Sequence, residues 1–226
     1  MEKPETVSII FDLDGVIINS EPIHKEIEKE MMLERGIELS PAEHLSYVGM
    51  AGYDMWKAVK EKYCLPESVD DLRREKRGRT QHFLDRMDDS VLVPGALECL
   101  RRLQRAGFPL ALASSSGQSY VSHVIDRFEI RDYFSVVTTG WDVERSMPAP
   151  DIFLLTAERL GARPSSCLVI EDSANGVRAA RSAGMAVIAY VGAMDGEQNT
   201  GSADWVTSDM GEITAEKIMK LVQSRI

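Results

Sequence analysis

The chain has 226 residues, of which 44% are hydrophobic and 27% charged, a composition typical of a water-soluble globular protein. Its net charge of -10 argues against a protein whose main task is to bind nucleic acid phosphates, although a bound cation can still make one pocket attract a small anion. Three widely spaced cysteines indicate neither a disulfide framework nor a zinc knuckle and fit a reducing cytoplasm. No stretch is apolar enough for a signal peptide or a membrane span. We therefore expect a cytoplasmic protein, monomeric or weakly dimeric, without nucleic acid or membrane partners.

Short apolar runs bounded by turn residues predict the strands of a parallel sheet, because strands that are covered on both faces lack polar alternation. These runs are Val7–Phe11, Pro109–Ala113, Phe134–Val137, Cys167–Ile170 and Met185–Tyr190. Helical patterns lie between them at residues 95–106, 121–128, 152–160 and 176–183. The alternation of strand and helix predicts an α/β fold with a doubly wound parallel sheet, Rossmann-like in type.

One segment breaks this alternation. After the first predicted strand, three stretches look helical instead, at residues 21–35, 52–63 and 68–87. We expect residues 18–87 to form an inserted α-helical cap domain, and residues 1–17 and 88–226 to form the α/β core. Ligands of open α/β sheets bind beyond the carboxyl ends of the strands. An insert that leaves the end of the first strand should therefore cover the binding site as a lid.

Two carboxylates, Asp12 and Asp14, follow the first predicted strand in the sequence FDLDGV. If the strand persisted, its alternation would put both acids on one side, and Gly15 would let the chain turn at once. Two close carboxylates repel, so either one is protonated or a cation is shared. A simple capping turn is the alternative explanation for an isolated motif of this kind.

Two other strand ends carry polar side chains. Ser114, Ser115 and Ser116 stand where the second predicted strand gives way to a helix, a setting that binds phosphate oxygens or merely caps the helix. Glu171 and Asp172 end the fourth predicted strand and offer the hard oxygen ligands that magnesium prefers. Asp172 has the alternative role of capping the next helix.

In this order, the motifs resemble those of the haloacid dehalogenase (HAD) superfamily, and most of all its β-phosphoglucomutase-like branch with a helical cap. The resemblance covers the whole chain. Residues 12–15 match the first family motif, Ser114 the second, residues 171–172 the fourth, and residues 148–153 the segment that follows the third.

The resemblance implies a role for each matched residue. Asp12 would attack phosphorus and become an aspartyl phosphate, while Asp14 would protonate the leaving oxygen and then activate water. Mg²⁺ would lie between Asp12, the backbone carbonyl of Asp14 and Asp172, with Glu171 nearby. Ser114 would bind the phosphoryl oxygens, together with the two serines that follow it. A carboxylate nucleophile of this kind divides one difficult displacement into two easier ones.

The chain departs from the third motif, a lysine directly before Pro-Ala-Pro-Asp, because it has Met147 there. The family lysine neutralises the phosphoryl group and the nucleophile, which a thioether cannot do. Three explanations stay open. Arg145 reaches the site, a cap lysine such as Lys57, Lys60 or Lys76 supplies the charge, or the site is impaired.

The predicted cap contains further clues to the substrate. β-Phosphoglucomutase has an arginine for the far phosphate at the position of Gly52, so its absence disfavours a mutase. His24 matches a family histidine in the first cap helix, and Lys76 lies near a position that contacts substrate. Trp56 and Trp141 are interpreted as core residues rather than pocket residues.

Taken together, these patterns predict a Mg²⁺-dependent phosphatase that acts through an aspartyl phosphate on Asp12. Its expected substrate is a small phosphorylated metabolite, with a sugar phosphate favoured. The alternatives are a phosphosugar mutase of the β-phosphoglucomutase type and a catalytically impaired HAD-fold protein that binds phosphate ligands, which Met147 keeps open.

Overall fold

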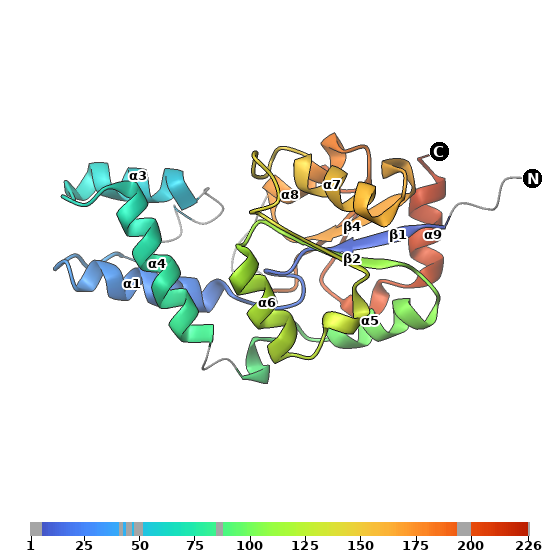
Figure 1. Cartoon of the computed structure of the whole chain (residues 1–226), viewed down its shortest axis with the longest axis horizontal. Helices are drawn as coiled ribbons and strands as arrows, with labels where there is room; N and C mark the ends of the chain where they lie inside the picture. The colour runs from blue at the N-terminus through green and yellow to red at the C-terminus, as the bar shows by residue number, and fades with distance from the viewer. Residues whose placement is uncertain are drawn as a thin grey trace, which may run out of the picture. The chain divides into compact units, whose positions relative to one another are not determined.

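The computed structural model describes residues 6–40, 43, 47, 52–84, 88–193 and 200–225. It separates into two compact units, one made of residues 1–19 and 89–226 and the other of residues 20–88. We call them the core unit and the cap unit (Figure 1). No helix among the described residues has both the length and the apolar character needed to cross a membrane.

The core unit is built on a six-stranded sheet in the order β3-β2-β1-β4-β5-β6, in which every strand pair is parallel. Its strands are β1 (Ser8–Phe11), β2 (Leu110–Ser114), β3 (Val136–Thr139), β4 (Cys167–Glu171), β5 (Ala186–Tyr190) and β6 (Trp205–Thr207). The predicted α/β parallel-sheet fold is confirmed. The short edge strand β6 was not predicted, because its three residues form no apolar run.

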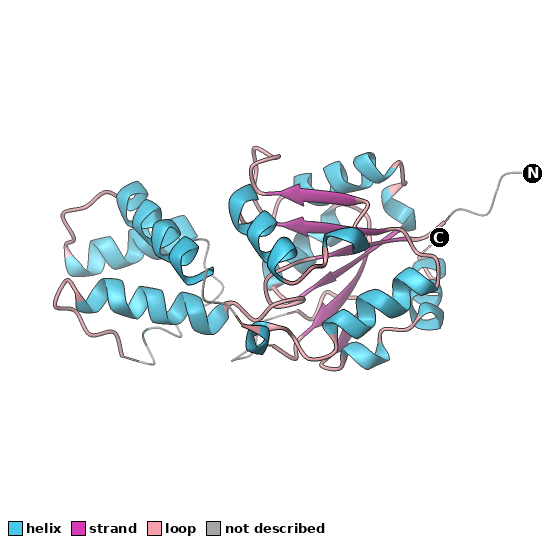
Figure 2. Ribbon diagram, turned by 60° about the horizontal axis from the view of Figure 1, so that its bottom comes forward, coloured by secondary structure: helices cyan, strands magenta, loops and turns pink. Residues whose placement is uncertain are grey.

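Helices cover both faces of this sheet (Figure 2). They are α5 (Ala96–Arg105), α6 (Gln118–Arg127), α7 (Asp151–Leu160), α8 (Ala174–Ser182) and α9 (Ala215–Gln223). Short 3₁₀ helices are η1 (Asp89–Val91), η2 (Arg131–Tyr133), η3 (Pro164–Ser166) and η4 (Met210–Glu212). On the α7 and α8 face, Phe153 and Val177 pack against strand side chains such as Ile10 and Val169. Figure 1 shows α5 and α6 on the opposite face. Burial on both faces explains why the four central strands, β2, β1, β4 and β5, are largely apolar.

The cap unit contains α1 (Glu21–Leu33), α3 (Gly52–Tyr63) and α4 (Val69–Leu84). Residues 85–87, at the end of the third predicted cap helix, lie outside the described residues. Trp56 is buried, as the sequence predicts for a core side chain, and it is accompanied by Met31, Val59 and Leu72. The helices of this unit therefore enclose an apolar interior of their own.

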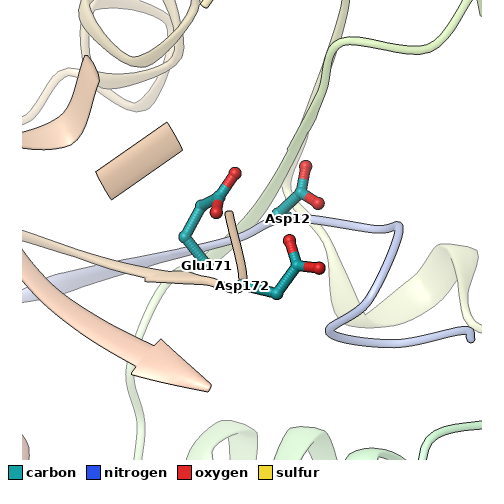
Figure 3. A group of neighbouring side chains, drawn as sticks. All are labelled: Asp12, Glu171 and Asp172. Carbon is teal, nitrogen blue, oxygen red and sulfur yellow. The ribbon is translucent and has the colours of Figure 1, made fainter. Parts of the chain in front are cut away.

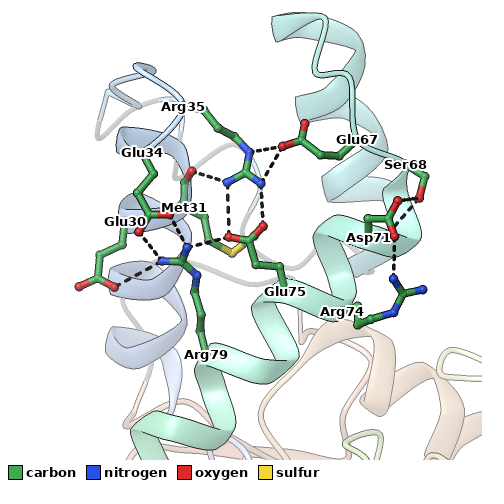
Figure 4. Close-up of polar contacts among 10 residues, drawn as sticks. All are labelled: Glu30, Met31, Glu34, Arg35, Glu67, Ser68, Asp71, Arg74, Glu75 and Arg79. Atoms are coloured by element: carbon green, nitrogen blue, oxygen red, sulfur yellow. Dashed lines mark hydrogen bonds and ion pairs between the residues drawn. The ribbon is translucent and has the colours of Figure 1, made fainter.

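Charged side chains join the helices of the cap unit on its surface (Figure 4). Arg35 donates to Glu67 and to Glu75 of α4, and Arg79 of α4 donates to Glu34 and Glu75. Arg79 also forms an ion pair with Glu30 at 4.0 Å, and Glu75 is shared between the two arginines.

Candidate active site

The strand register brings three chain segments to one edge of the core sheet. Phe11 is paired with Leu112 of β2 and with Ile170 of β4. The next residue, Asp12, donates its backbone N–H to the carbonyl of Ile170 at 2.9 Å. Because the carboxyl ends of parallel strands meet at the same edge, the residues that follow β1, β2 and β4 become neighbours there.

Three carboxylates gather at this edge, as Figure 3 shows. One oxygen each from Asp12, Glu171 and Asp172 lies within 4.8 Å of the other two. Asp12 is 6% exposed and Glu171 only 2%. Oxygen ligands of this type and spacing fit a hard divalent cation.

Two glycines give these carboxylates room. Gly15 has φ +80°, a left-handed conformation that favours glycine, and a Cβ atom there would overlap the carboxylate of Asp172. A Cβ on Gly176 would overlap the carboxylate of Glu171 in the same way. The sequence predicts the turn at Gly15, but only the structure shows that the turn also seats Asp172.

Burial and mutual repulsion dominate the electrostatics of the cluster. Burial raises the pKa of Asp12 well above its ordinary value, and the charges of Glu171, Asp172 and Asp14 raise it further. Burial also raises the pKa of Glu171, followed by the effect of Asp172, although hydrogen bonds from Ser173 act in the opposite direction. A bound cation would favour the ionised carboxylates, so the cluster fits the predicted metal site.

Asp172 is not the cap of α8. Ser173 occupies the N-cap position, and its Oγ accepts a hydrogen bond from the backbone N–H of Gly176 at 3.0 Å. The capping alternative for Asp172 is therefore wrong, and its carboxylate faces the cluster instead.

Asp14 is directed to different partners from Asp12. The strand ends at Phe11, so the alternation that would put both acids on one side does not continue. Ser116 Oγ donates to Asp14 Oδ2 at 2.9 Å, and Ser114 Oγ lies 3.5 Å from the same oxygen. The hydroxyl of Tyr120 donates to Asp14 Oδ1 at 2.7 Å.

The sequence motifs do not predict a role for Tyr120. The one available signal was its place in the first turn of the helix that follows these serines. The capping alternative for the serines is also wrong. Gly117 is the N-cap of α6 and no side chain caps that helix, while Ser115 is exposed and Ser114 is fully buried.

The structure does not bring Arg145 to the carboxylate cluster. Its Nε donates to Asp151 at 2.9 Å, and its side chain is 72% exposed. Met147 is partly buried and packs against the apolar core beside α7 and α8. Position 147 thus contributes an apolar contact to the core unit in place of the positive charge of the family lysine.

Two other predicted cations bond within the cap unit. Lys76 is paired with the buried carboxylate of Glu28. Lys60 donates to the backbone carbonyls of Leu65 at 2.6 Å and Glu67 at 2.7 Å, just beyond the end of α3. His24 lies in α1 of the same unit and is half-buried.

The prediction that both tryptophans are core residues is wrong for Trp141. It lies in the turn after β3 and is 65% exposed. A Cβ on Gly117 would be 3.1 Å from its indole Nε1, so the ring lies against the loop that follows β2. Its turn position places it outside the helical spacing on which the prediction was based.

Relatives of this chain are named as phosphatases. The "Bifunctional riboflavin kinase/FMN phosphatase" of Arabidopsis thaliana is 34% identical over 210 residues, which is 92% of this chain but 55% of that protein. The "Probable pseudouridine-5'-phosphatase" of Drosophila melanogaster is 33% identical over 217 residues and is covered to 91%. The "Fructose-1-phosphate phosphatase YqaB" of Escherichia coli is 29% identical over 177 residues, 78% of this chain and 92% of that protein.

Solved structures share the fold over nearly the whole chain. A HAD hydrolase of family IA, variant 3, from Entamoeba histolytica has a TM-score of 0.85 at 25% identity and covers 96% of this chain and 99% of its own. The β-phosphoglucomutase of Clostridium difficile has a TM-score of 0.80 at 22% identity, covers 97% and 98%, and supports the fold alone.

A family model described as "haloacid dehalogenase-like hydrolase" matches residues 8–184. This span includes β1, β2 and β4 with the carboxylates and serines that follow them. The match confirms the predicted resemblance. The chain is an enzyme of the haloacid dehalogenase-like hydrolase family.

Proposed function

We propose that this enzyme is a Mg²⁺-dependent phosphatase that hydrolyses phosphomonoesters through an aspartyl phosphate on Asp12. Its proposed substrate is a small phosphorylated metabolite, with a sugar phosphate favoured. The observation that carries the proposal is the buried cluster of Asp12, Glu171 and Asp172, with Asp14 beside it on the hydroxyls of the β2–α6 loop. The names of the relatives support the phosphatase class.

In the first step, a carboxylate oxygen of Asp12 bonds to phosphorus as the bond from phosphorus to the leaving oxygen breaks. Asp14 gives its proton to that leaving oxygen, which departs as an alcohol. Ser114 and Ser116 stand at the strand end where their hydroxyls can donate to the phosphoryl oxygens.

In the second step, water attacks phosphorus and the bond from phosphorus to Asp12 breaks. Asp14 now takes the proton of that water, so it returns to its protonated form while inorganic phosphate leaves. Asp12, the backbone carbonyl of Asp14 and Asp172 would hold Mg²⁺, with Glu171 nearby. When bound, the metal supplies positive charge that offsets the repulsion between the carboxylate nucleophile and the phosphate.

We propose that residues 18–87 form the cap domain and act as a lid over this edge. The cap unit of residues 20–88 supports a separate domain there. His24 and Lys76 would contact the substrate from the lid. Lys76 would then have to exchange Glu28 for the substrate, since these two side chains are paired.

Two alternative functions differ in what they require. A phosphosugar mutase needs a second phosphate-binding side chain, for the far phosphate of its substrate, and Gly52 provides none. A protein that binds phosphate ligands without turnover is the alternative that Met147 keeps open.

Metal removal and phosphate-analogue trapping test the proposal. Turnover of a panel of sugar phosphates should stop in excess EDTA and return with Mg²⁺, and beryllium fluoride should form an adduct at Asp12. Asp12→Asn should abolish both, whereas Asp126→Asn, in a surface ion pair with Arg131, should leave both unchanged. Undiminished turnover in EDTA would contradict the metal site. If the wild type binds sugar phosphates without turning them over, the alternative of a non-catalytic phosphate-binding protein is favoured.

A further inference from the structure

The two carboxylate oxygens of Asp14 have different partners. Oδ1 accepts a hydrogen bond from the Tyr120 hydroxyl at 2.7 Å. Oδ2 accepts from Ser116 Oγ at 2.9 Å and lies 3.5 Å from Ser114 Oγ. All three hydroxyls come from one continuous segment, which runs from the end of β2 through the loop into the first turn of α6.

The serine contacts cannot persist when a phosphoryl group binds to these hydroxyls. A serine hydroxyl has one proton, so while it donates to a phosphoryl oxygen it cannot donate to Asp14. Substrate binding would therefore withdraw the hydroxyls of Ser114 and Ser116 from Oδ2. The Tyr120 hydroxyl, which contacts the other oxygen, would keep its hydrogen bond.

We propose that Tyr120 is a positioning residue that holds Oδ1 of Asp14, so that Oδ2 performs the proton transfers. This inference rests on the proposed phosphatase function. When Asp14 is protonated, Oδ1 is the carbonyl oxygen that accepts the hydrogen bond from the Tyr120 hydroxyl, and the acid's own proton is on Oδ2. That proton passes to the leaving oxygen, Oδ2 takes another from the attacking water, and Tyr120 retains its own throughout.

The position of Tyr120 suits this role. It stands in the first turn of α6, where the backbone N–H of Val121 donates to the carbonyl of Gly117 at 3.1 Å. Val121, Val124 and Ile125 of the same helix are buried in the core unit. The tyrosine ring itself is partly buried and has two rotatable side-chain torsions. Its hydroxyl is therefore held from a packed helix, a firmer support than a surface loop.

A comparison of leaving groups separates this role from a general structural one. The probes are p-nitrophenyl phosphate, whose leaving group departs without protonation, and glycerol 2-phosphate, whose alkoxide needs a proton from Asp14. The variant is Tyr120→Phe, which removes only the hydroxyl. Tyr133→Phe is the matched control, since its hydroxyl contacts Arg101 on the surface of the core unit.

We expect Tyr120→Phe to lower kcat/KM for glycerol 2-phosphate by about tenfold or more and to change kcat/KM for p-nitrophenyl phosphate less than about twofold. Tyr133→Phe should change neither. An equal loss with both substrates, or no loss with either, would overturn the role of Tyr120.

A second measurement does not depend on turnover. In crystals of Tyr120→Phe soaked with inorganic phosphate, which would take the hydrogen bonds of the serine hydroxyls, the Asp14 carboxylate should leave the orientation that it has in wild-type crystals with phosphate, or occupy more than one. A single, unchanged orientation would overturn the proposal even if neither phosphate is hydrolysed. Failure of the wild type with both phosphates would instead count against the proposed function, while the crystals would still decide the role of Tyr120.

Discussion

The carboxylate cluster of the core unit and the arginine-linked carboxylates of the cap unit lie in opposite environments. In the core unit, Asp12 and Glu171 are buried beside another acid, and burial raises the pKa of both. In the cap unit, Glu34 and Glu75 accept hydrogen bonds from arginines, which lower the pKa of both carboxyls. The cap carboxylates are compensated by the chain itself. The clustered carboxylates of the core unit repel one another, and a bound cation would offset that repulsion.

This difference separates a functional cluster from a structural one. Buried like charges oppose folding unless a ligand or a proton compensates them, so they are retained where chemistry needs them. A surface network of Arg and Glu needs no ligand and joins helices instead. The following predictions test this contrast, from the largest expected effect to the smallest.

Asp12→Asn tests the functional side of the contrast. The amide keeps the shape of the side chain but cannot attack phosphorus, so kcat should fall by at least about 10³-fold. Steady-state turnover of any accepted sugar phosphate, together with a thermal melt to check folding, measures this. Retention of wild-type kcat would show that another group is the nucleophile.

Met147→Lys would supply the cation that the cluster lacks at this position. A charge that stabilises the crowded transition state more than the ground state should raise kcat/KM by at least about tenfold, or roughly 1.4 kcal/mol. The upper range is about 10²–10³, typical of one electrostatic contact. An unchanged kcat/KM in a folded variant would mean that the site already has its cation.

Arg145→Ala is the companion variant. Because Arg145 is exposed and paired with Asp151, we expect its loss to change kcat/KM less than about twofold in either background. A large loss that disappears in the Met147→Lys background would instead show that Arg145 serves the site during turnover.

The dependence of stability on pH should show the cost of burying the Asp12 carboxylate beside other acids. A carboxyl with a raised pKa in the folded state binds more protons there than in the unfolded chain, so its contribution to stability falls as pH rises through that interval. In chelator, Asp12→Asn should therefore melt close to the wild type at acid pH and above it at neutral pH. Mg²⁺ should reduce the neutral-pH difference, because it binds the folded wild type. A difference in Tm that is independent of pH would argue that the Asp12 charge is not responsible.

Arg35→Met tests the structural side of the contrast. Its guanidinium joins the end of α1 to Glu67 and Glu75, and its side chain is only 16% exposed, so its loss should destabilise the cap unit by about 1–2 kcal/mol. Hydrogen exchange should accelerate at amides of α1 and α4. Arg74→Met is the matched control, because Arg74 is 72% exposed and its ion-pair partner Asp71 lies in the same helix, α4. Equal acceleration of exchange in both variants would show that the contacts of Arg35 do not stabilise the cap unit more than an exposed ion pair does.

The sequence by itself determined the strands and the acids that end them. Runs such as Cys167–Ile170 must be covered on both faces, which is why they predict a parallel sheet, and such sheets bring their carboxyl ends together. Asp12 and Glu171 could therefore be placed at one edge from local patterns alone. Two elements were not predicted, the edge strand Trp205–Thr207 and the helix Ala215–Gln223. The strand was not predicted because it is short and lacks an apolar run.

Only the tertiary structure decided which partners the side chains around those acids have. Asp14 turns away from the strand alternation because β1 ends at Phe11, and its partner Tyr120 lies 106 residues along the chain. Arg145 pairs with Asp151, and Trp141 lies in a turn rather than on a helix. Local periodicity reports which face of an element is apolar. Contacts between segments far apart in the chain depend on which elements become neighbours in the folded unit, and local periodicity does not contain that information.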